Sequence, residues 1–218
     1  MDGRGYDFEI IVVDDGSTDD TAAVVTNIAA GEPRIRLVAN LCNRGKGYTV
    51  RHGIRESGGD VVLFSDADLS TPIEEYDKLL AYLDDFDLVI ASRSLPDSDV
   101  AVRQPAYREM MGRMFNVLVQ MLIVRGIIDT QCGFKLMKAE PARAISGLMR
   151  IDRFSFDVEM ILAARRLGYR YVDVPVRWIN SAGSRVHPLR DSINMLLDLF
   201  RIKLYDIAGH YKNGLERE

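Results

Sequence analysis

The chain has 218 residues, which fits one domain at a soft prior of roughly 150 residues per domain. A hydrophobic fraction of 47% is enough for a sizeable core, and a formal net charge of -4 argues against a general nucleic-acid binder. The two cysteines, Cys42 and Cys132, are too few for a disulfide framework and favour free thiols in a reducing compartment. We expect no signal peptide and no spanning helix, because the most apolar long stretch, Phe115–Ile128, contains Gln120 and Arg125.

The first predicted strand, Phe8–Val13, runs directly into Asp14 and Asp15, and a short helix over Thr21–Ala30 follows. Both acids therefore lie at the carboxyl end of a strand, where an acid can accept hydrogen bonds from a ribose or a base edge. A helix cap and a turn explain the same residues, and this stretch alone favours that simpler interpretation.

Arg34–Ala39 alternates in polarity and predicts a second strand, and a helix from about Lys46 to Ser57 comes next. Gly45 and Gly47 flank Lys46 at the start of that helix. Two glycines around a lysine can bring backbone N–H groups and one positive charge up to a phosphate. This is not a Walker motif, because its spacing and the Ser or Thr after the lysine are absent.

The stretch Val61–Pro72 (VVLFSDADLSTP) is the strongest local signal in the chain. A β-branched apolar run predicts a buried strand, which ends at Asp66-Ala67-Asp68, and a helix is predicted from Pro72 to Asp85. Two carboxylates at a strand's carboxyl end offer the hard oxygen ligands that suit Mg²⁺ or Mn²⁺, and such an ion can bridge to a diphosphate. Turn formation and helix-start charge are the alternative explanation.

The succession VVDDGSTDDT, NRGKGYTVRHGI and GDVVLFSDADLSTP resembles the inverting GT-A (family 2) glycosyltransferases that use nucleotide-diphosphate sugars. More narrowly, it is similar to the subgroup that glycosylates polyprenyl phosphate, which contains the dolichyl-phosphate β-glucosyltransferases and bacterial relatives. The resemblance implies a single α/β domain over residues 1–218, with a Rossmann-like, mostly parallel sheet flanked by helices. Ser70 stands where the mannose synthases of this subgroup carry glutamine, which favours the glucosyl branch.

The resemblance also implies roles for residues of these three motifs. Asp66 and Asp68 would hold the metal and act in catalysis. The nucleotide sugar would be bound by Asp14, Asp15, Lys46, Gly47 and Asp66, with Asp15 and Asp14 near the base and ribose.

Beyond the third motif, the strand Asp87–Ser92 ends at Arg93, which can aim a fixed positive fork at a phosphate or form a surface ion pair. A broad apolar helix is predicted over Arg103–Ile128. Most of its side chains are expected in the core, and the surplus can lie against a bilayer surface with Arg108 and Arg113 at the headgroups. In similar enzymes, Ala/Gly-Ser-Arg faces the acceptor phosphate, and an arginine at the Arg108 position binds the lipid phosphate.

The string Asp129–Lys135 (DTQCGFK) is close to a signature of the polyprenyl-phosphate glycosyltransferases. The resemblance implies that Asp129 is catalytic and lies near the anomeric centre, and that Lys135 belongs to the acceptor-phosphate site. A short strand, Gly133–Met137, is predicted to return to the sheet.

The last third is predicted to hold a helix from Phe156 to about Leu167, an edge or bulged strand over Tyr169–Ile179, and an amphipathic helix at about 188–207. Asp157 in the first of these helices is either an N-terminal charge or an orienting group on the acceptor side. By resemblance, Ser184 and Arg185 close over the phosphates.

One feature departs from the family pattern. The family begins one strand and one helix earlier, whereas here only Met1–Asp7 precedes the first predicted strand. The family's first strand would be central, between the strands ending at Asp15 and Asp66, so we expect two open strand edges there. A fragment, a shortened gene and a protein that fills the gap by other means all fit.

The sequence thus predicts transfer of a hexose, preferentially glucose, from a UDP-sugar to polyprenyl or dolichyl phosphate with inversion, using Mg²⁺ or Mn²⁺. The enzyme is expected at the cytoplasmic face of a membrane, as a peripheral protein without nucleic-acid partners, and a homo-oligomer is left open. Use of GDP-mannose or of a glycan acceptor is one alternative. An inactive nucleotide-sugar-binding or membrane-scaffold fragment is another.

Overall fold

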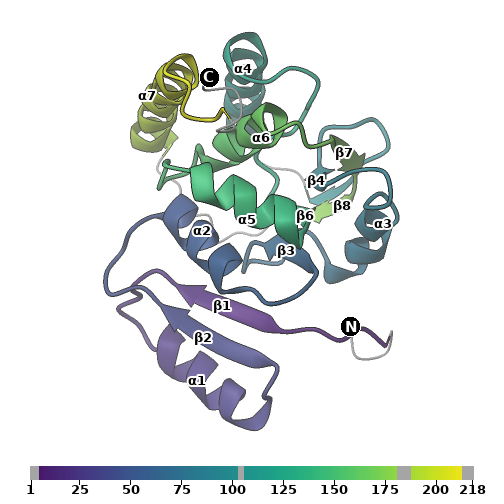
Figure 1. The fold of residues 1–218 in the computed structure, drawn as a ribbon, viewed down its shortest axis with the longest axis vertical. Coiled ribbons are helices and arrows are strands. Elements are labelled where there is room, and N and C mark those ends of the chain that lie inside the picture. The colour runs from purple at the N-terminus through teal and green to yellow at the C-terminus, as the bar shows by residue number, and fades with distance from the viewer. Residues whose placement is uncertain (1–4, 103–105, 181–187, 213–218) are drawn as a thin grey trace.

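The computed structural model describes residues 5–102, 106–180 and 188–212, and for residues 106, 108 and 188–190 it describes the backbone alone. The chain forms an α/β fold in which helices cover short sheets (Figure 1). At one end lies a small unit in which two parallel strands, β1 (Ile10–Asp14) and β2 (Ile35–Ala39), are joined by α1 (Thr21–Gly31). Helix α2 (Lys46–Glu56) connects this unit to β3 (Val61–Ser65).

The central sheet has the strand order β3–β6–β4–β7, with β4 at Leu88–Ser92, β6 at Phe134–Lys138 and β7 at Tyr171–Pro175. β6 runs antiparallel to both β3 and β4, whereas β4 and β7 are parallel. Within the described ranges, three of the five strand pairs are parallel, so the sheets are mixed, within the predicted α/β class. Because β6 is antiparallel, it begins at the edge where β3 and β4 end.

β1 and β3 belong to different sheets. Among the described residues, β1 pairs with β2 alone and β3 pairs with β6 alone, so each strand has one edge without a strand partner. The two open edges therefore lie where the sequence predicts an interruption of the family's sheet.

Two predicted elements are divided in the structure. The helix predicted from Pro72 to Asp85 is a 3₁₀ turn, η2 (Ile73–Glu75), and a short helix, α3 (Tyr76–Leu80), followed by turns. The strand predicted over Tyr169–Ile179 is two strands, β7 and β8 (Arg177–Ile179), which lie in different sheets. The chain changes sheets just after Pro175, which cannot donate a hydrogen bond to a continuing ladder.

The remaining elements complete the covering layers. They are β5 (Asp99–Val102), which pairs with β8, and the helices α4 (Ala106–Leu122), α5 (Ala139–Leu148), α6 (Phe156–Arg166) and α7 (Pro188–Ile207). Helix α4 ends earlier than predicted, and β5 and α5 were not predicted. The range of α7 agrees with the predicted C-terminal helix.

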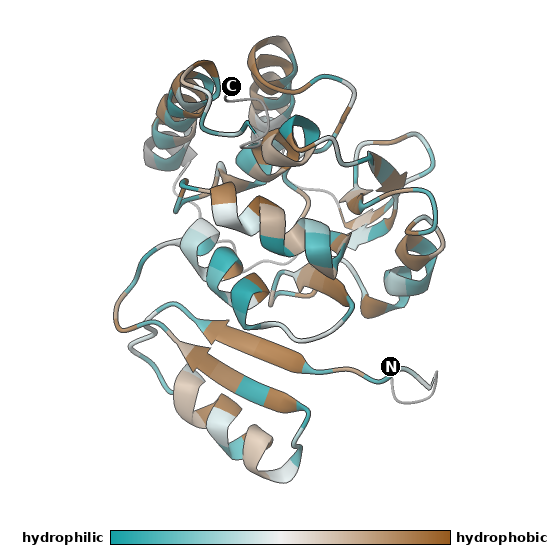
Figure 2. Cartoon of the chain, in the orientation of Figure 1, coloured by the Kyte–Doolittle hydropathy of each residue, from teal (hydrophilic) through white to brown (hydrophobic). Residues whose placement is uncertain are grey.

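The apolar core lies on the two faces of the central sheet. One cluster joins β4 and β6 to α2, α4, α5, α6 and α7, and a smaller cluster joins the other face to α3. All five residues of β4 are buried. Among the described residues, β1, α1 and β2 contribute no side chain to either cluster, although β1 and β2 are as hydrophobic as the core strands (Figure 2).

Candidate functional site

Three of the predicted motifs meet at one edge of the central sheet. Asp66 follows β3, Arg93 follows β4, and Asp129 lies shortly before β6. The register pairs Ser65 with Phe134, so the Asp66-Ala67-Asp68 turn faces the start of β6. The antiparallel return of β6 thus brings together motifs that are more than 60 residues apart in the sequence.

Asp66 is neutralised by a lysine from the neighbouring helix. The Nζ atom of Lys46, in the first turn of α2, lies 2.7 Å from Oδ1 and 2.8 Å from Oδ2 of Asp66. Gly133 lies directly against the carboxylate, and a Cβ atom at this position would overlap the oxygens of Asp66. The glycine of the DTQCGFK string is therefore required by the position of Asp66.

Asp68 is more open than Asp66. Its side chain is exposed, and Oδ1 accepts a hydrogen bond of 3.0 Å from the backbone N–H of Ser70. Leu69 between them has φ 51°, the left-handed region that few residues other than glycine adopt, and such strain is frequent at functional sites. The turn is thus held in an unusual conformation that presents Asp68 to solvent.

The two carboxylates have the right chemistry for a hard divalent cation. No group of three or more His, Cys, Asp or Glu side chains converges as a metal site within the part of the chain that the structure describes. A metal held by Asp66 and Asp68 would therefore take its other ligands from water or a bound phosphate, as Mg²⁺ does in phosphate-transfer sites. Such an open site fits the predicted use of the metal.

Arg93 and Asp129 form a bidentate ion pair. The Nε and Nη2 atoms of Arg93 donate to the two oxygens of Asp129 at 2.7 Å and 2.9 Å, and the Arg93 backbone N–H adds a third bond. Asp129 is only 5% exposed. Burial alone would raise the pKa of Asp129, but the guanidinium of Arg93 outweighs it and holds the pKa below its ordinary value. Asp129 is thus an ionised anchor for Arg93 in this arrangement.

Lys135 lies inside the protein. Its side chain has no exposed surface, and Nζ donates to Asp157 Oδ1 at 2.5 Å and to the carbonyl of Cys132 at 2.7 Å. Burial raises the pKa of Asp157 despite the opposing effect of Lys135. The predicted contact between Lys135 and an acceptor phosphate does not fit this structure, because the ammonium is enclosed and already paired.

The three pairs lie close enough to influence one another. The charges of Lys46 and Asp66 both affect the pKa of Asp157. The charge of Asp157 affects the pKa of Arg93, and that of Lys135 affects the pKa of Asp129. The Lys135–Asp157 pair therefore lies between the Lys46–Asp66 pair and the Arg93–Asp129 pair. The sequence signal for Asp157 was its place at the start of the helix predicted from Phe156, but nothing local indicated that its partner is a fully buried lysine.

Asp14 and Asp15 hold loops at the end of β1. Asp15 accepts hydrogen bonds from the backbone N–H groups of Arg44 and Gly45, each at 2.8 Å, and from the Asn40 side chain at 2.9 Å. Burial alone would raise the pKa of Asp15, and these hydrogen bonds outweigh it and lower the pKa. Asp14 is buried and accepts hydrogen bonds from the N–H and hydroxyl of Ser17. The predicted contact of both acids with a base or ribose stays a prediction.

The start of α2 is occupied by another segment of the chain. The N–H groups of Gly47 and Tyr48 donate to the carbonyl of Asp152 at 2.8 Å and 3.2 Å. A Cβ atom on Gly45 or Gly47 would overlap the carbonyl of Asp152 or Ile151. The two glycines thus admit the segment before α6, and these N–H groups are not available for the predicted phosphate contact. The ammonium of Lys46 lies on the Asp66 side instead.

Three predicted residues cannot be placed. The backbone of Arg108 lies in α4, but its side chain lies outside the described residues, and Ser184 and Arg185 lie outside them altogether.

The α/β fold places the paired acids after β3 and Arg93 after β4 at one edge of the sheet, as expected from the resemblance to the GT-A glycosyltransferases. Residues 2–146 match the family model for Glycosyl transferase family 2, and the chain belongs to this family.

Known relatives and solved structures agree with this assignment. The chain is 38% identical over 215 residues to a dolichyl-phosphate beta-glucosyltransferase of Dictyostelium discoideum, covering 95% of this chain and 66% of the relative. It is 32% identical over 216 residues to the human protein of the same name, covering 95% and 67%. Glucosyl-3-phosphoglycerate synthase of Mycobacterium tuberculosis, solved with Mn²⁺, UDP-glucose and phosphoglyceric acid, superposes with a TM-score of 0.64 at 22% identity, covering 91% of this chain and 68% of the other. The chain thus spans about two thirds of the length of these relatives.

Proposed function

We propose that the chain transfers glucose from UDP-glucose to dolichyl or another polyprenyl phosphate, with inversion at the anomeric carbon. The observation that carries the proposal is the row of charge pairs along one sheet edge, with Lys46–Asp66 at one end and Arg93–Asp129 at the other. A UDP-sugar and a lipid phosphate are both anionic, and their reaction needs two cationic places side by side. The relatives at 32–38% identity are named for glucose transfer to dolichyl phosphate.

The donor side of the proposed site consists of Asp66, Asp68 and Lys46. A bound Mg²⁺ or Mn²⁺ would neutralise the negative charge that grows on the leaving UDP. Asp66 and Asp68 would hold that ion through carboxylate oxygens, and Lys46 supplies a second positive charge at the same place. Asp14, Asp15 and Gly47 shape the nucleotide side, with Asp15 fixing the loop that leads into α2.

The acceptor side is built on Arg93. The two oxygens of Asp129 accept hydrogen bonds from Nε and Nη2 of Arg93. Among the described residues, the third guanidinium nitrogen, Nη1, has no hydrogen-bond partner and can bind a phosphate. Arg108, Ser184 and Arg185 are further candidates for the acceptor phosphate.

A phosphate oxygen is already an anion at neutral pH, so its attack on the anomeric carbon needs no strong general base. The bond between that carbon and the UDP oxygen breaks, and UDP leaves. An ionised, paired Asp129 agrees with a positioning role.

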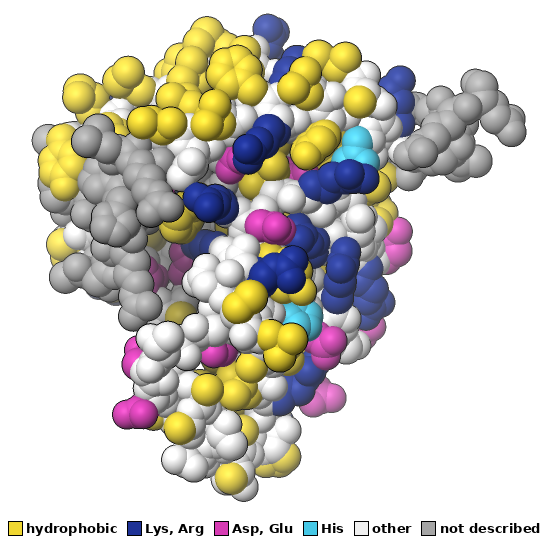
Figure 3. Space-filling model, turned by 90° about the vertical axis from the view of Figure 1, so that its left-hand side faces the viewer, with side chains coloured by type: hydrophobic (Ala, Val, Ile, Leu, Met, Phe, Trp, Pro, Cys, Tyr) yellow, Lys and Arg dark blue, Asp and Glu magenta, His cyan; other side chains and the backbone are white. Residues whose placement is uncertain are grey.

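A membrane surface is proposed as the place of action, because α4 and α7 together expose an apolar face. The exposed apolar side chains recur at helical spacing and are Met110, Met114, Val117 and Met121 on α4, and Ile193, Leu197, Phe200, Leu204 and Ile207 on α7. Figure 3 shows hydrophobic side chains gathered at the end of the molecule that α4 and α7 form in Figure 1. Three acids of these helices, Glu109, Asp198 and Asp206, are paired with arginines, which lowers the cost of approaching lipid. No helix of the described ranges is long and apolar enough to cross a bilayer.

The test is a transfer assay with the whole chain, Mn²⁺ or Mg²⁺, labelled UDP-glucose and polyprenyl phosphate in vesicles. Labelled lipid that disappears with EDTA or in the Asp68→Asn variant is the expected result. An unchanged rate in Asp68→Asn would remove the metal assignment. If labelled GDP-mannose yields labelled lipid and labelled UDP-glucose does not, the donor is GDP-mannose and not UDP-glucose. Metal-dependent UDP binding without any labelled lipid would favour a non-catalytic binding role.

A further inference from the structure

The position of Lys46 is not explained by phosphate binding alone. Its ammonium lies almost symmetrically between the two oxygens of Asp66, at 2.7 Å and 2.8 Å. A divalent cation bound to this carboxylate needs the same oxygen lone pairs. Lys46 therefore competes with a metal for Asp66 in the arrangement that the structure describes.

The surroundings of Lys46 favour this position. The first turn of α2 is fixed by the hydrogen bonds from Gly47 and Tyr48 to the carbonyl of Asp152. The ammonium also lies 5.6 Å from the ring centre of Phe64 and 6.0 Å from that of Phe156, within the range of cation–π attraction. The two rings pack edge to face, and the ammonium of Lys46 has both of them and the Asp66 carboxylate as neighbours.

We propose that Lys46 is a resident counter-ion of Asp66, that a divalent cation displaces it, and that the freed ammonium then pairs with the diphosphate of the nucleotide. This inference rests on the proposed function in that it takes Asp66 as a metal ligand. Two cations cannot share one partly buried carboxylate without repulsion. The other nearby acid, Asp157, is already paired with Lys135. A displaced ammonium therefore gains a partner only when nucleotide is present, so metal and nucleotide should bind cooperatively.

The test is a titration of the whole chain with Mn²⁺ followed by electron paramagnetic resonance, without and with UDP. Lys46→Met removes the charge and keeps the length of the side chain. Without nucleotide, we expect this variant to bind Mn²⁺ about tenfold more tightly than the wild type. We expect UDP to raise the Mn²⁺ affinity of the variant by a smaller factor than it raises that of the wild type. Unchanged or weaker Mn²⁺ binding in Lys46→Met would overturn the proposal.

Lys138→Met is the matched control. Lys138 forms a similarly exposed lysine–aspartate pair with Asp87 at 3.0 Å, at the other end of β6. The variant changes the net charge equally and should leave Mn²⁺ binding as in the wild type. An equal tightening in both variants would mean that net charge is the cause, and the proposal would fall.

A second variant keeps the proposal testable if Lys46→Met does not fold. In Lys46→Arg, the planar guanidinium can hold both oxygens of Asp66, so Mn²⁺ should bind several-fold more weakly without nucleotide. Tighter or unchanged binding would contradict the proposal. Glucose transfer by the wild type, together with unchanged Mn²⁺ affinity in these variants, would refute Lys46 displacement and leave the proposed function intact. The predicted Mn²⁺ affinities without glucose transfer by the wild type would support the displacement and refute the proposed function.

Discussion

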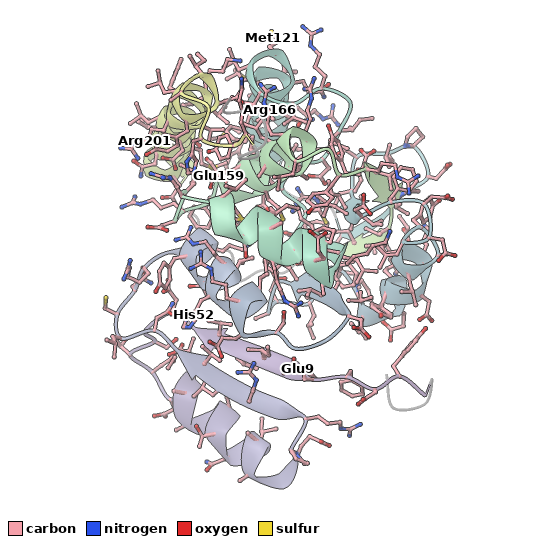
Figure 4. All side chains as sticks on the ribbon, in the orientation of Figure 1. Glu9, His52, Met121, Glu159, Arg166 and Arg201 are labelled. Carbon is pink, nitrogen blue, oxygen red and sulfur yellow. The ribbon has the colours of Figure 1, made fainter. Side chains whose placement is uncertain are left out.

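Residues 5–45 and the central sheet are stabilised by different interactions. In the central sheet, β4 and most of β6 are buried between two apolar clusters. Among the described part of residues 5–45, no apolar side chain is fully buried. Beside the ring contact of Tyr6 with Tyr76, polar contacts join this region to the rest of the chain. Glu9 accepts a hydrogen bond from the Gly58 N–H, and the Asn40 side chain donates to the hydroxyl of Thr49 in α2. Asp15 orders the loop that leads into α2. Figure 4 labels Glu9 beside β1 and His52 in α2, whose ring lies 2.8 Å from the Asn40 side chain.

This difference divides the proposed site. The acceptor side, Arg93 and Asp129, is built on strands with a dry core behind them. The nucleotide side depends on a unit that hydrogen bonds attach to α2. In the part of the chain that the structure describes, β1 in this unit and β3 in the central sheet each have one edge without a strand partner. We therefore expect substitutions in the sheet to act on global stability, and substitutions in residues 5–45 to act on local order and nucleotide affinity.

The largest effect is expected from emptying the core. Phe134 in β6 has no exposed surface, so Phe134→Ala should lower the free energy of unfolding by about 3–5 kcal/mol. Val24→Ala in α1 is the contrasting variant, because Val24 is 52% exposed, and it should change stability by no more than about 0.5 kcal/mol. Urea unfolding followed by circular dichroism measures both. Similar losses in the two variants would contradict the division between the regions.

A loss of nearly equal size is expected at the buried ion pair. Asp157→Ala leaves the ammonium of Lys135 without its carboxylate in a fully buried place, and should lower the free energy of unfolding by about 3–5 kcal/mol. Replacing both partners, with Lys135→Met and Asp157→Leu, should recover much of that loss, because no charge is then buried alone. If the double variant is no more stable than the single one, the cost comes from lost packing or hydrogen bonds and not from the unpaired charge.

The same contrast explains what the sequence could predict. The strand before Asp66 and the placement of Asp66 and Asp68 at its end were predictable, because an apolar run followed by acids and a proline is a local pattern. The burial of Lys135 was not, since lysine is usually a surface residue and its partner lies 22 residues further along. The pairing of Arg93 with Asp129 depends on the direction of β6, which no local pattern specifies. The division of the last predicted strand depends on pairing with two different sheets, and only Pro175 signalled it.

A smaller effect is expected from Asp15. Asp15→Ala removes the acceptor for the N–H groups of Arg44 and Gly45, whose exchange with solvent deuterium should become faster, with a stability loss of about 1–2 kcal/mol. Binding of UDP with Mn²⁺ should weaken, while amide exchange in β4 stays as in the wild type. Asp20→Ala makes the same charge change at a helix start where the side chain forms no capping hydrogen bond, and should leave all three quantities unchanged. Faster exchange in β4 would show that residues 5–45 and the sheet unfold as one unit.

The smallest effect is a difference in pH dependence between the two regions. The hydrogen bond from the Gly58 N–H lowers the pKa of Glu9, and hydrogen bonds also lower that of Asp15 in spite of its burial. Groups with lowered folded-state pKa values stabilise the fold above their unfolded pKa values, which are about 4.3 for Glu and about 3.9 for Asp. This contribution is lost as the pH falls through the folded values. In the sheet region the signs are mixed. Burial raises the pKa values of Asp157 and Glu159, whose contribution is lost as the pH rises through the raised values, whereas Arg93 lowers the pKa of Asp129 in spite of its burial, and that contribution is lost on acidification.

Acidification should loosen residues 5–45 before the sheet, because the sheet is also stabilised by two apolar clusters that do not titrate. Amide exchange, corrected for the intrinsic effect of pH, should show the protection of β1 falling as the pH drops from about 5 through the lowered folded values, while that of β4 is retained. A Glu9→Gln variant, which cannot titrate at this position, should show a smaller fall in β1. If β1 and β4 lose protection together, residues 5–45 are not the weaker part of the molecule, because the sheet with its two apolar clusters would then be as sensitive to acid as they are.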